Sequence, residues 1–184
     1  MPYEIEEPED HFIAENIIAP FFPRLSVGVR INGREVKITK RNADNQYDID
    51  WGIVRGDETL AVIDTEYKPK WRNGKYPYFS VARYTYAYNH GDSNYPRETV
   101  KVHYYRDYPD ESFWMAIRSD YQFAGVIKGG EVINSTIGFR PQPVNFVRDI
   151  EIFEFPCEEM TFSNAYSFDI EDYILDCLDE INVL

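Results

Sequence analysis

The sequence has little of several residue types that would define a common functional class. Among its 184 residues there are two cysteines and three histidines. Cys157 and Cys177 lack CxxC spacing, and the histidines are dispersed. We expect buried thiols rather than a zinc site or a disulfide, which is consistent with a reducing cytoplasm.

Long apolar segments and two common catalytic loops are also missing. No run approaches the roughly 18 apolar residues that span a bilayer. The first ten residues are acidic and lack an apolar stretch, so no signal peptide is expected and a cytoplasmic location is predicted. No glycine-rich phosphate loop precedes a helix and no serine elbow is present, which argues against a P-loop enzyme and a serine hydrolase.

Basic residues are scarce, with 19 Lys and Arg against 32 Asp and Glu and a net charge of −13. Such a charge weakens association with nucleic acid. Part of the acidity gathers at the two ends, in residues 4–10 and 169–180. Following Lys68, a basic cluster could form a local groove on the acidic body, and its members are the candidate DNA contacts Lys70, Arg72, Lys75 and Arg83.

The length and the 16% of aromatic residues favour one domain, residues 1–184, with a sizeable core. Periodicity and turn signals such as Asn32-Gly33 divide the chain into elements. Helices are expected at 9–19, 78–89 and 169–182. Strands are expected at 26–30, 35–39, 47–54, 59–68, 99–106, 112–118, 122–127, 131–134 and 147–155. A proline-rich loop is expected at 138–143.

The most informative pattern lies in the hairpin predicted for residues 47–68. Asp50 stands sixteen residues before Glu66, and Glu66-Tyr67-Lys68 closes an apolar run. Because side chains alternate along a strand, Glu66 and Lys68 share a face, and the hairpin brings Asp50 close to it. Carboxylates bind a hard cation, the cation activates water, and a lysine orients or deprotonates that water. The pattern is that of a Mg²⁺-dependent phosphodiesterase.

These residues resemble the PD-(D/E)XK nuclease superfamily, with Asp50 as the first acid and Glu66-Tyr67-Lys68 as the (Asp/Glu)-x-Lys element. Ile49 stands where proline is usual in that family. The resemblance implies an α/β fold with a restriction-endonuclease-like αβββαβ core, a mixed central sheet and flanking helices. This core would cover about residues 9–118, with further strands and a terminal helix in about 119–184.

The same resemblance implies an endonuclease that hydrolyses DNA phosphodiester bonds with Mg²⁺ or Mn²⁺. DNA is then the expected partner, no membrane is involved, and a homodimer is the candidate assembly. Asp50 and Glu66 would bind the metal, with the Tyr67 backbone carbonyl as a further ligand. Lys68 would position the attacking water, which makes Asp50, Glu66 and Lys68 the catalytic set.

Three further acids compete for a place in this site. Asp48 lies two residues before Asp50 and shares its strand face, so either could be the first acid. Asp64 shares the face of Glu66, and an acid within an apolar strand is costly unless it is paired or binds metal. Glu15 lies in the first predicted helix, where many members of the superfamily place a glutamate, and it is equally compatible with a solvated helix surface.

A second hypothesis belongs to a different class of protein. The chain could be a non-catalytic acidic α/β interaction module, in which Glu66 and Lys68 form a solvated strand end and Asp50 pairs with a lysine. The net charge of −13 favours this reading. A focused basic patch beside the acids would support the nuclease, and a uniformly negative surface would support the module.

Overall fold

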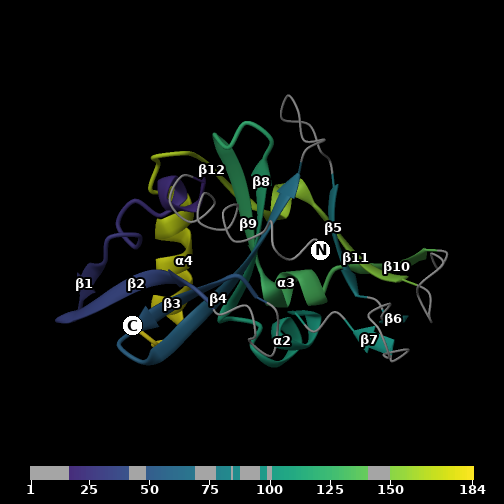
Figure 1. Ribbon diagram of the computed structural model, residues 1–184, viewed down its shortest axis with the longest axis horizontal. Helices are drawn as coiled ribbons and strands as arrows, with labels where there is room; N and C mark the ends of the chain where they lie inside the picture. The colour runs from purple at the N-terminus through teal and green to yellow at the C-terminus, as the bar shows by residue number, and fades with distance from the viewer. Residues whose placement is uncertain are drawn as a thin grey trace.

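The chain forms a mixed α/β structure with many strands and few helices, as the sequence predicts (Figure 1). The computed structural model describes residues 17–41, 49–68, 78–83, 85–87, 96–98, 101–140 and 150–184. The strands are β1 (Val29–Ile31), β2 (Arg34–Lys40), β3 (Trp51–Arg55), β4 (Glu58–Lys68), β5 (Tyr78–Arg83), β6 (Thr85–Ala87), β7 (Pro96–Glu98), β8 (Ser112–Arg118), β9 (Phe123–Lys128), β10 (Thr136–Arg140), β11 (Ile150–Pro156) and β12 (Thr161–Asn164). The helices are η3 (Ala19–Phe21), α2 (Lys101–Asp107), α3 (Gly129–Ile133), η4 (Cys157–Glu159) and α4 (Asp169–Glu180).

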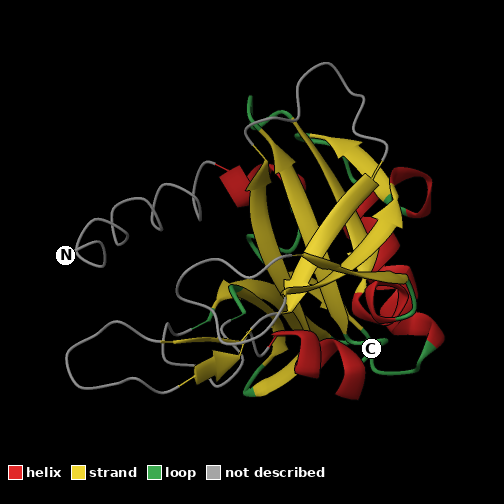
Figure 2. Cartoon of the chain, turned by 90° about the vertical axis from the view of Figure 1, so that its right-hand side faces the viewer, coloured by secondary structure: helices red, strands yellow, loops and turns green. Residues whose placement is uncertain are grey.

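A seven-stranded sheet in the order β1-β2-β3-β4-β8-β9-β12 organises the molecule. Strands β1 to β4 form an antiparallel meander, β4 pairs with β8 in parallel, and β9 and β12 continue antiparallel. Figure 2 shows the twist of this sheet and the helices packed against it. Strands β10, β11 and β5 form a second sheet, and β6 pairs with β7. The expected mixed central sheet is therefore present.

Strand β8, in the middle of the central sheet, is buried on both faces. Phe113, Met115 and Ile117 of β8 enter one core together with Ile170 and Ile174 of α4. The alternate residues Trp114 and Ala116 enter a second core, which includes Tyr105 of α2 and Val132 of α3. Parallel strands are commonly covered on both sides, and this two-sided burial explains the nearly continuous apolar sequence of β8.

The two hairpins predicted at the start of the chain are present. Ile31 pairs with Arg34 across Asn32 and Gly33, whose φ angles of 53° and 80° give the mirror-image turn that suits twisted strands. Strands β3 and β4 form the hairpin that carries the acidic motif, and Gly56 at φ 62° lies in its turn. Short-range turn chemistry identified both features correctly.

Two segments have the opposite secondary structure from the one predicted. The helix expected at 78–89 is wrong, because Tyr78–Arg83 and Thr85–Ala87 are strands. The strand expected at 99–106 is also wrong, because Lys101–Asp107 is a helix. Strand β5 pairs with β11 along its whole length, so pairing with a distant segment overrides its helical spacing. The helix that precedes β8 is thus present, but it lies later in the sequence.

Other boundaries shift in the second half of the chain. The strand expected at 131–134 belongs to α3, and residues 136–140, partly within the expected loop at 138–143, form β10. The expected strand at 147–155 is confirmed as β11, and the terminal helix as α4. The helix expected at 9–19 lies almost wholly outside the described residues. Within the described ranges, no helix has the length and apolarity needed to cross a membrane.

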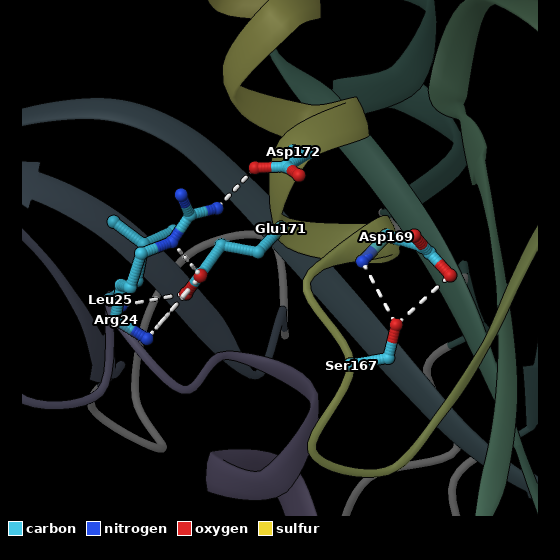
Figure 3. Close-up of polar contacts among 6 residues, drawn as sticks. All are labelled: Arg24, Leu25, Ser167, Asp169, Glu171 and Asp172. Atoms are coloured by element: carbon cyan, nitrogen blue, oxygen red, sulfur yellow. Dashed lines mark hydrogen bonds and ion pairs between the residues drawn. The ribbon is translucent and has the colours of Figure 1, made fainter.

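A fully buried carboxylate joins the two ends of the described chain (Figure 3). Glu171, in the first turn of α4, accepts hydrogen bonds from the backbone amides of Arg24 and Leu25 at 3.0 and 2.7 Å. The Arg24 guanidinium donates Nε to Glu171 at 2.6 Å and Nη2 to the exposed carboxylate of Asp172. Both contacts raise the pKa of Arg24.

Helix α4 begins after Phe168, which forms no side-chain cap hydrogen bond, although Ser167 or Asp169 was expected to cap the helix. The Asp169 amide donates to the Ser167 hydroxyl at 3.4 Å. Cys177 is a buried free thiol on the same helix. The side chain of Cys157 is outside the described part.

Replacing Glu171 with glutamine should lower the free energy of unfolding by about 2–3 kcal/mol. The shape is preserved, but in either orientation the amide nitrogen would face an N–H donor, which is the Arg24 guanidinium at one oxygen position and the Leu25 amide at the other. Asp172→Asn is the matched control, because Asp172 contacts the same arginine with a side chain that is 54% exposed. The control should cost less than about 1 kcal/mol. Urea unfolding, monitored by circular dichroism, measures the stability of both variants. Equal losses of stability would contradict the structural role of Glu171.

Candidate functional site

Strand β4 carries three charged residues of the motif on one face. Asp64, Glu66 and Lys68 are spaced by two, and their parallel register pairs Asp64 with Trp114 and Lys68 with Arg118 on β8. Trp114 belongs to the core beneath α2 and α3. Asp64 is only 5% exposed, whereas the Glu66 side chain is 41% exposed. The row of charges therefore begins at a buried position and continues with two partly exposed side chains.

The indole of Trp114 supports the outer part of this row. Its Nε1 donates to Glu66 Oε2 at 3.2 Å, and Lys68 Nζ lies 5.5 Å from its ring centroid. Lys68 Nζ also lies 3.3 Å from Glu66 Oε1. Each carboxylate oxygen of Glu66 therefore has a contact within the protein. The two motif residues lie side by side, as strand alternation predicts, and Trp114 orients them.

Asp50 is anchored to β4 from the neighbouring strand. It directly precedes β3, and the pairing of Trp51 with Ile63 places Asp50 opposite Asp64. Asp50 Oδ2 accepts hydrogen bonds from the Thr65 amide and the Thr65 hydroxyl, both at 2.9 Å. The Trp51 indole donates to the same hydroxyl at 3.2 Å. Asp50 thus lies beside Thr65, the residue between Asp64 and Glu66, and its hydrogen bonds hold the start of β3 against β4.

Tyr105 of α2 brings a buried hydroxyl to the same face. The side chain is fully buried, and its hydroxyl has no hydrogen-bond partner within the described part of the chain. Burial holds the pKa of Tyr105 well above its usual value, and the charges of Asp64, Asp50 and Glu66 raise the pKa further. A neutral hydroxyl therefore lies in the field of three carboxylates.

The position of Tyr105 depends on a glycine of the neighbouring helix. A Cβ on Gly129 would lie 2.8 Å from Cδ1 of the Tyr105 ring and 2.1 Å from the Ser112 hydroxyl. Only a residue without a side chain allows α3 to approach α2 and β8 this closely. Gly129 falls between the strands expected at 122–127 and 131–134, so this packing role was not evident from the sequence.

A second cation stands at the solvent end of the row. Arg118 pairs with Lys68 in register, and it binds both carboxylate oxygens of Asp120 at 3.0 and 2.7 Å. This contact lowers the pKa of Asp120. The guanidinium also lies 4.9 Å from the Phe123 ring centroid. Arg118 was not among the predicted nucleic-acid contacts, because its proximity to Lys68 arises from strand pairing alone.

Several predicted site residues cannot be placed beside these groups. Glu15, Asp48, Lys70, Arg72 and Lys75 lie outside the described residues, as does the side chain of Arg83. Their roles stay predictions. The Tyr67 side chain is 46% exposed, and its hydroxyl donates to the Ser119 carbonyl at 3.4 Å. The proposed ligand is the backbone carbonyl of Tyr67, which also stays a prediction.

The donor chemistry of the site suits a hard cation, but the described residues do not complete a metal centre. Carboxylate oxygens are the preferred ligands of Mg²⁺. No group of three Asp, Glu, His or Cys side chains within the described ranges could hold a metal ion as placed. A complete site would require movement of Glu66 away from Lys68, or ligands from the parts of the chain that are not described.

Comparisons with known proteins add one structural similarity. No protein-family model matches the chain, and no curated protein matches it significantly. A solved structure, described as a nuclease from a fusselovirus, is similar over 80% of this chain and 80% of its own length. The TM-score is 0.43 and the sequence identity is 13%. The site must therefore be interpreted from its own residues.

The contacts of the two motif carboxylates predict different effects on stability. Asp50→Asn should lower the free energy of unfolding by about 1–2 kcal/mol, because it weakens charge-assisted hydrogen bonds to Thr65. Glu66→Gln should change it by less than about 1 kcal/mol, because its ion pair is partly exposed. Chemical denaturation of both variants without divalent cations measures the difference. A larger loss for Glu66→Gln would contradict this assignment.

Proposed function

We propose that this chain is a metal-dependent phosphodiesterase that cleaves DNA, with Mg²⁺ or Mn²⁺ as cofactor. The observation that supports the proposal best is the position of Lys68 Nζ, 3.3 Å from Glu66 Oε1 at the end of a strand that also carries Asp64. Asp50, from the neighbouring strand, adds a third carboxylate beside the same backbone. Carboxylates and one ammonium on adjoining positions match the requirements of phosphodiester hydrolysis.

In the proposed reaction, Asp50 and Glu66 would hold the cation, with the Tyr67 carbonyl as a further ligand. The bound cation would neutralise negative charge on the phosphate and lower the pKa of water. Glu66 would have to exchange its contact with Lys68 for the cation. The Lys68 ammonium would then be available to orient the attacking water, or to accept its proton after first losing its own to solvent. Asp64, which is buried next to these groups, is the reserve ligand.

The interaction-module hypothesis is the second candidate because of three observations. Both Glu66 oxygens are already occupied by Lys68 and Trp114, and the described residues contain no ready metal-binding group. The net charge of −13 also opposes DNA binding. In this reading, the acids and Lys68 only stabilise the edge of a core, and the chain binds a protein partner.

Cation binding separates the two candidates. Titration calorimetry of the native chain with Mg²⁺ or Mn²⁺ should detect binding, and Glu66→Ala or Asp50→Asn should weaken it at least about tenfold. Glu58→Gln is the matched control, because Glu58 lies at the opposite end of β4 and pairs with Arg55. It should bind as the native chain does. No binding by the native chain would contradict the proposal.

Lys68→Ala should reduce DNA cleavage about a hundredfold or more, the lower range for a lost acid–base group. Its stability should change by less than about 1 kcal/mol, because the ion pair with Glu66 is partly exposed. Lys37→Ala, at an exposed position of β2, controls for a general loss of positive charge. Cleavage of plasmid and single-stranded DNA with Mg²⁺ is the assay. A folded Lys68→Ala variant that cleaves normally would remove Lys68 from the mechanism.

A further inference from the structure

Arg41, the residue that follows β2, carries a partly buried cation that the contacts of the fold leave without an acceptor. Its Nε is buried without a hydrogen-bond partner, and no carboxylate of the described ranges pairs with it. The Nε of Arg55 is also buried and unpartnered, but its Nη2 pairs with Glu58 at 2.9 Å. Arg24 and Arg118 each contact a carboxylate as well. Because a guanidinium can only donate hydrogen bonds, Arg41 requires an acceptor from elsewhere.

Strand pairing fixes where this cation lies. Lys40 pairs with Trp51, so Arg41 lies opposite Asp50, and the Arg41 amide donates to the Asp50 carbonyl at 2.8 Å. The Cγ of Arg41 lies 3.7 Å from the position that a Cβ on Gly52 would take. The side chain therefore passes over β3, which is the strand between β2 and β4.

The face that Arg41 crosses is also the face of the acidic motif. Residues two apart on a strand share a face, so Gly52 lies on the side of Asp50. Asp50 in turn lies opposite Asp64, which shares its face with Glu66. Asp50 does not pair with the guanidinium but directs a carboxylate oxygen to the backbone of β4. An arginine without a counter-charge therefore lies beside the carboxylates of the candidate site.

We propose that Arg41 binds a phosphate group of the DNA substrate beside the motif. The inference rests on the proposed function and adds a contact residue that the sequence did not identify. A guanidinium presents a planar fork of N–H donors that matches two oxygens of a phosphate. In a purely structural role, Arg41 would be expected to pair with a nearby acid, as Arg24 pairs with Glu171. An unpaired cation here would also offset part of the repulsion between the acids and DNA.

The test measures binding of a fluorescently labelled DNA duplex to the full chain by anisotropy, over a range of salt concentrations. EDTA is present, so neither cleavage nor a bound cation contributes. Arg41→Gln should bind the duplex about tenfold more weakly at low salt, the effect of losing one charge-assisted hydrogen bond. It should also reduce the slope of log affinity against log salt by about 0.9, because one phosphate contact is lost.

Two further variants separate this role from general effects of charge and shape. Arg41→Lys should keep the salt slope, because the charge is preserved, but should bind less tightly than the native chain, because the planar fork is lost. Arg34→Gln is the matched control for loss of one positive charge. Arg34 is exposed at the other end of β2, about 20 Å away along the strand, where salt screens its charge from the site. This control should keep the native affinity and slope, and circular dichroism checks the fold of all variants.

Three results would overturn the role of Arg41 while cation binding and cleavage by the motif stand. They are an unchanged slope in Arg41→Gln, equal losses in Arg41→Gln and Arg34→Gln, and equal reductions of the slope in Arg41→Gln and Arg41→Lys. If the native chain binds DNA through Arg41 but binds no cation and cleaves nothing, the contact stands and the catalytic proposal fails. Absence of DNA binding by the native chain at low salt would overturn both.

Discussion

The parallel pairing of β4 with β8 is the constraint on which the rest of the structure depends. Parallel neighbours cannot be joined by a tight turn, so the chain between them must cross a face of the sheet. Helix α2 is the last helix or strand of this connection, and a turn after Asp107 leads from it to β8. The same pairing aligns Asp64 with Trp114 and buries β8 on both faces. The charged end of β4, the indole that orients it and the helix above it are consequences of one strand pairing.

Two buried polar groups on opposite sides of this sheet have different meanings. Glu171 is fully buried and receives two backbone amides and a guanidinium, so its lone pairs are used within the fold. Tyr105 is equally buried, but its hydroxyl is unused in the described structure. A satisfied buried carboxylate stabilises the arrangement that satisfies it, whereas an unsatisfied hydroxyl carries a cost that packing does not explain. The first is therefore structural, whereas no contact of the described residues explains the second.

Sequence reasoning succeeded where the signal is local and failed where a distant partner decides. Asn32-Gly33 encodes its own turn, and α4 has one apolar face, so both were predicted correctly. Residues 78–83 and 101–107 are both rich in aromatic side chains, which suit a helix or a strand equally well. Pairing with β11 makes the first a strand, whereas the second forms a helix that packs against α3 and β8. The local sequence of neither segment decides between a helix and a strand.

The candidate site shows the same division. Alternation along one strand was enough to place Glu66 beside Lys68, but nothing in the sequence connects either residue with Trp114. This missed contact affects the chemistry, because the indole and Lys68 together occupy both oxygens of Glu66. In the proposed reaction, Glu66 would give up its contact with Lys68 in order to hold the cation, and the Lys68 ammonium would then lose the attraction that keeps it beside Glu66. Cation binding by Glu66 and release of Lys68 towards water would then occur together. The contact between Glu66 and Lys68 in the cation-free protein would thus have a role in the mechanism.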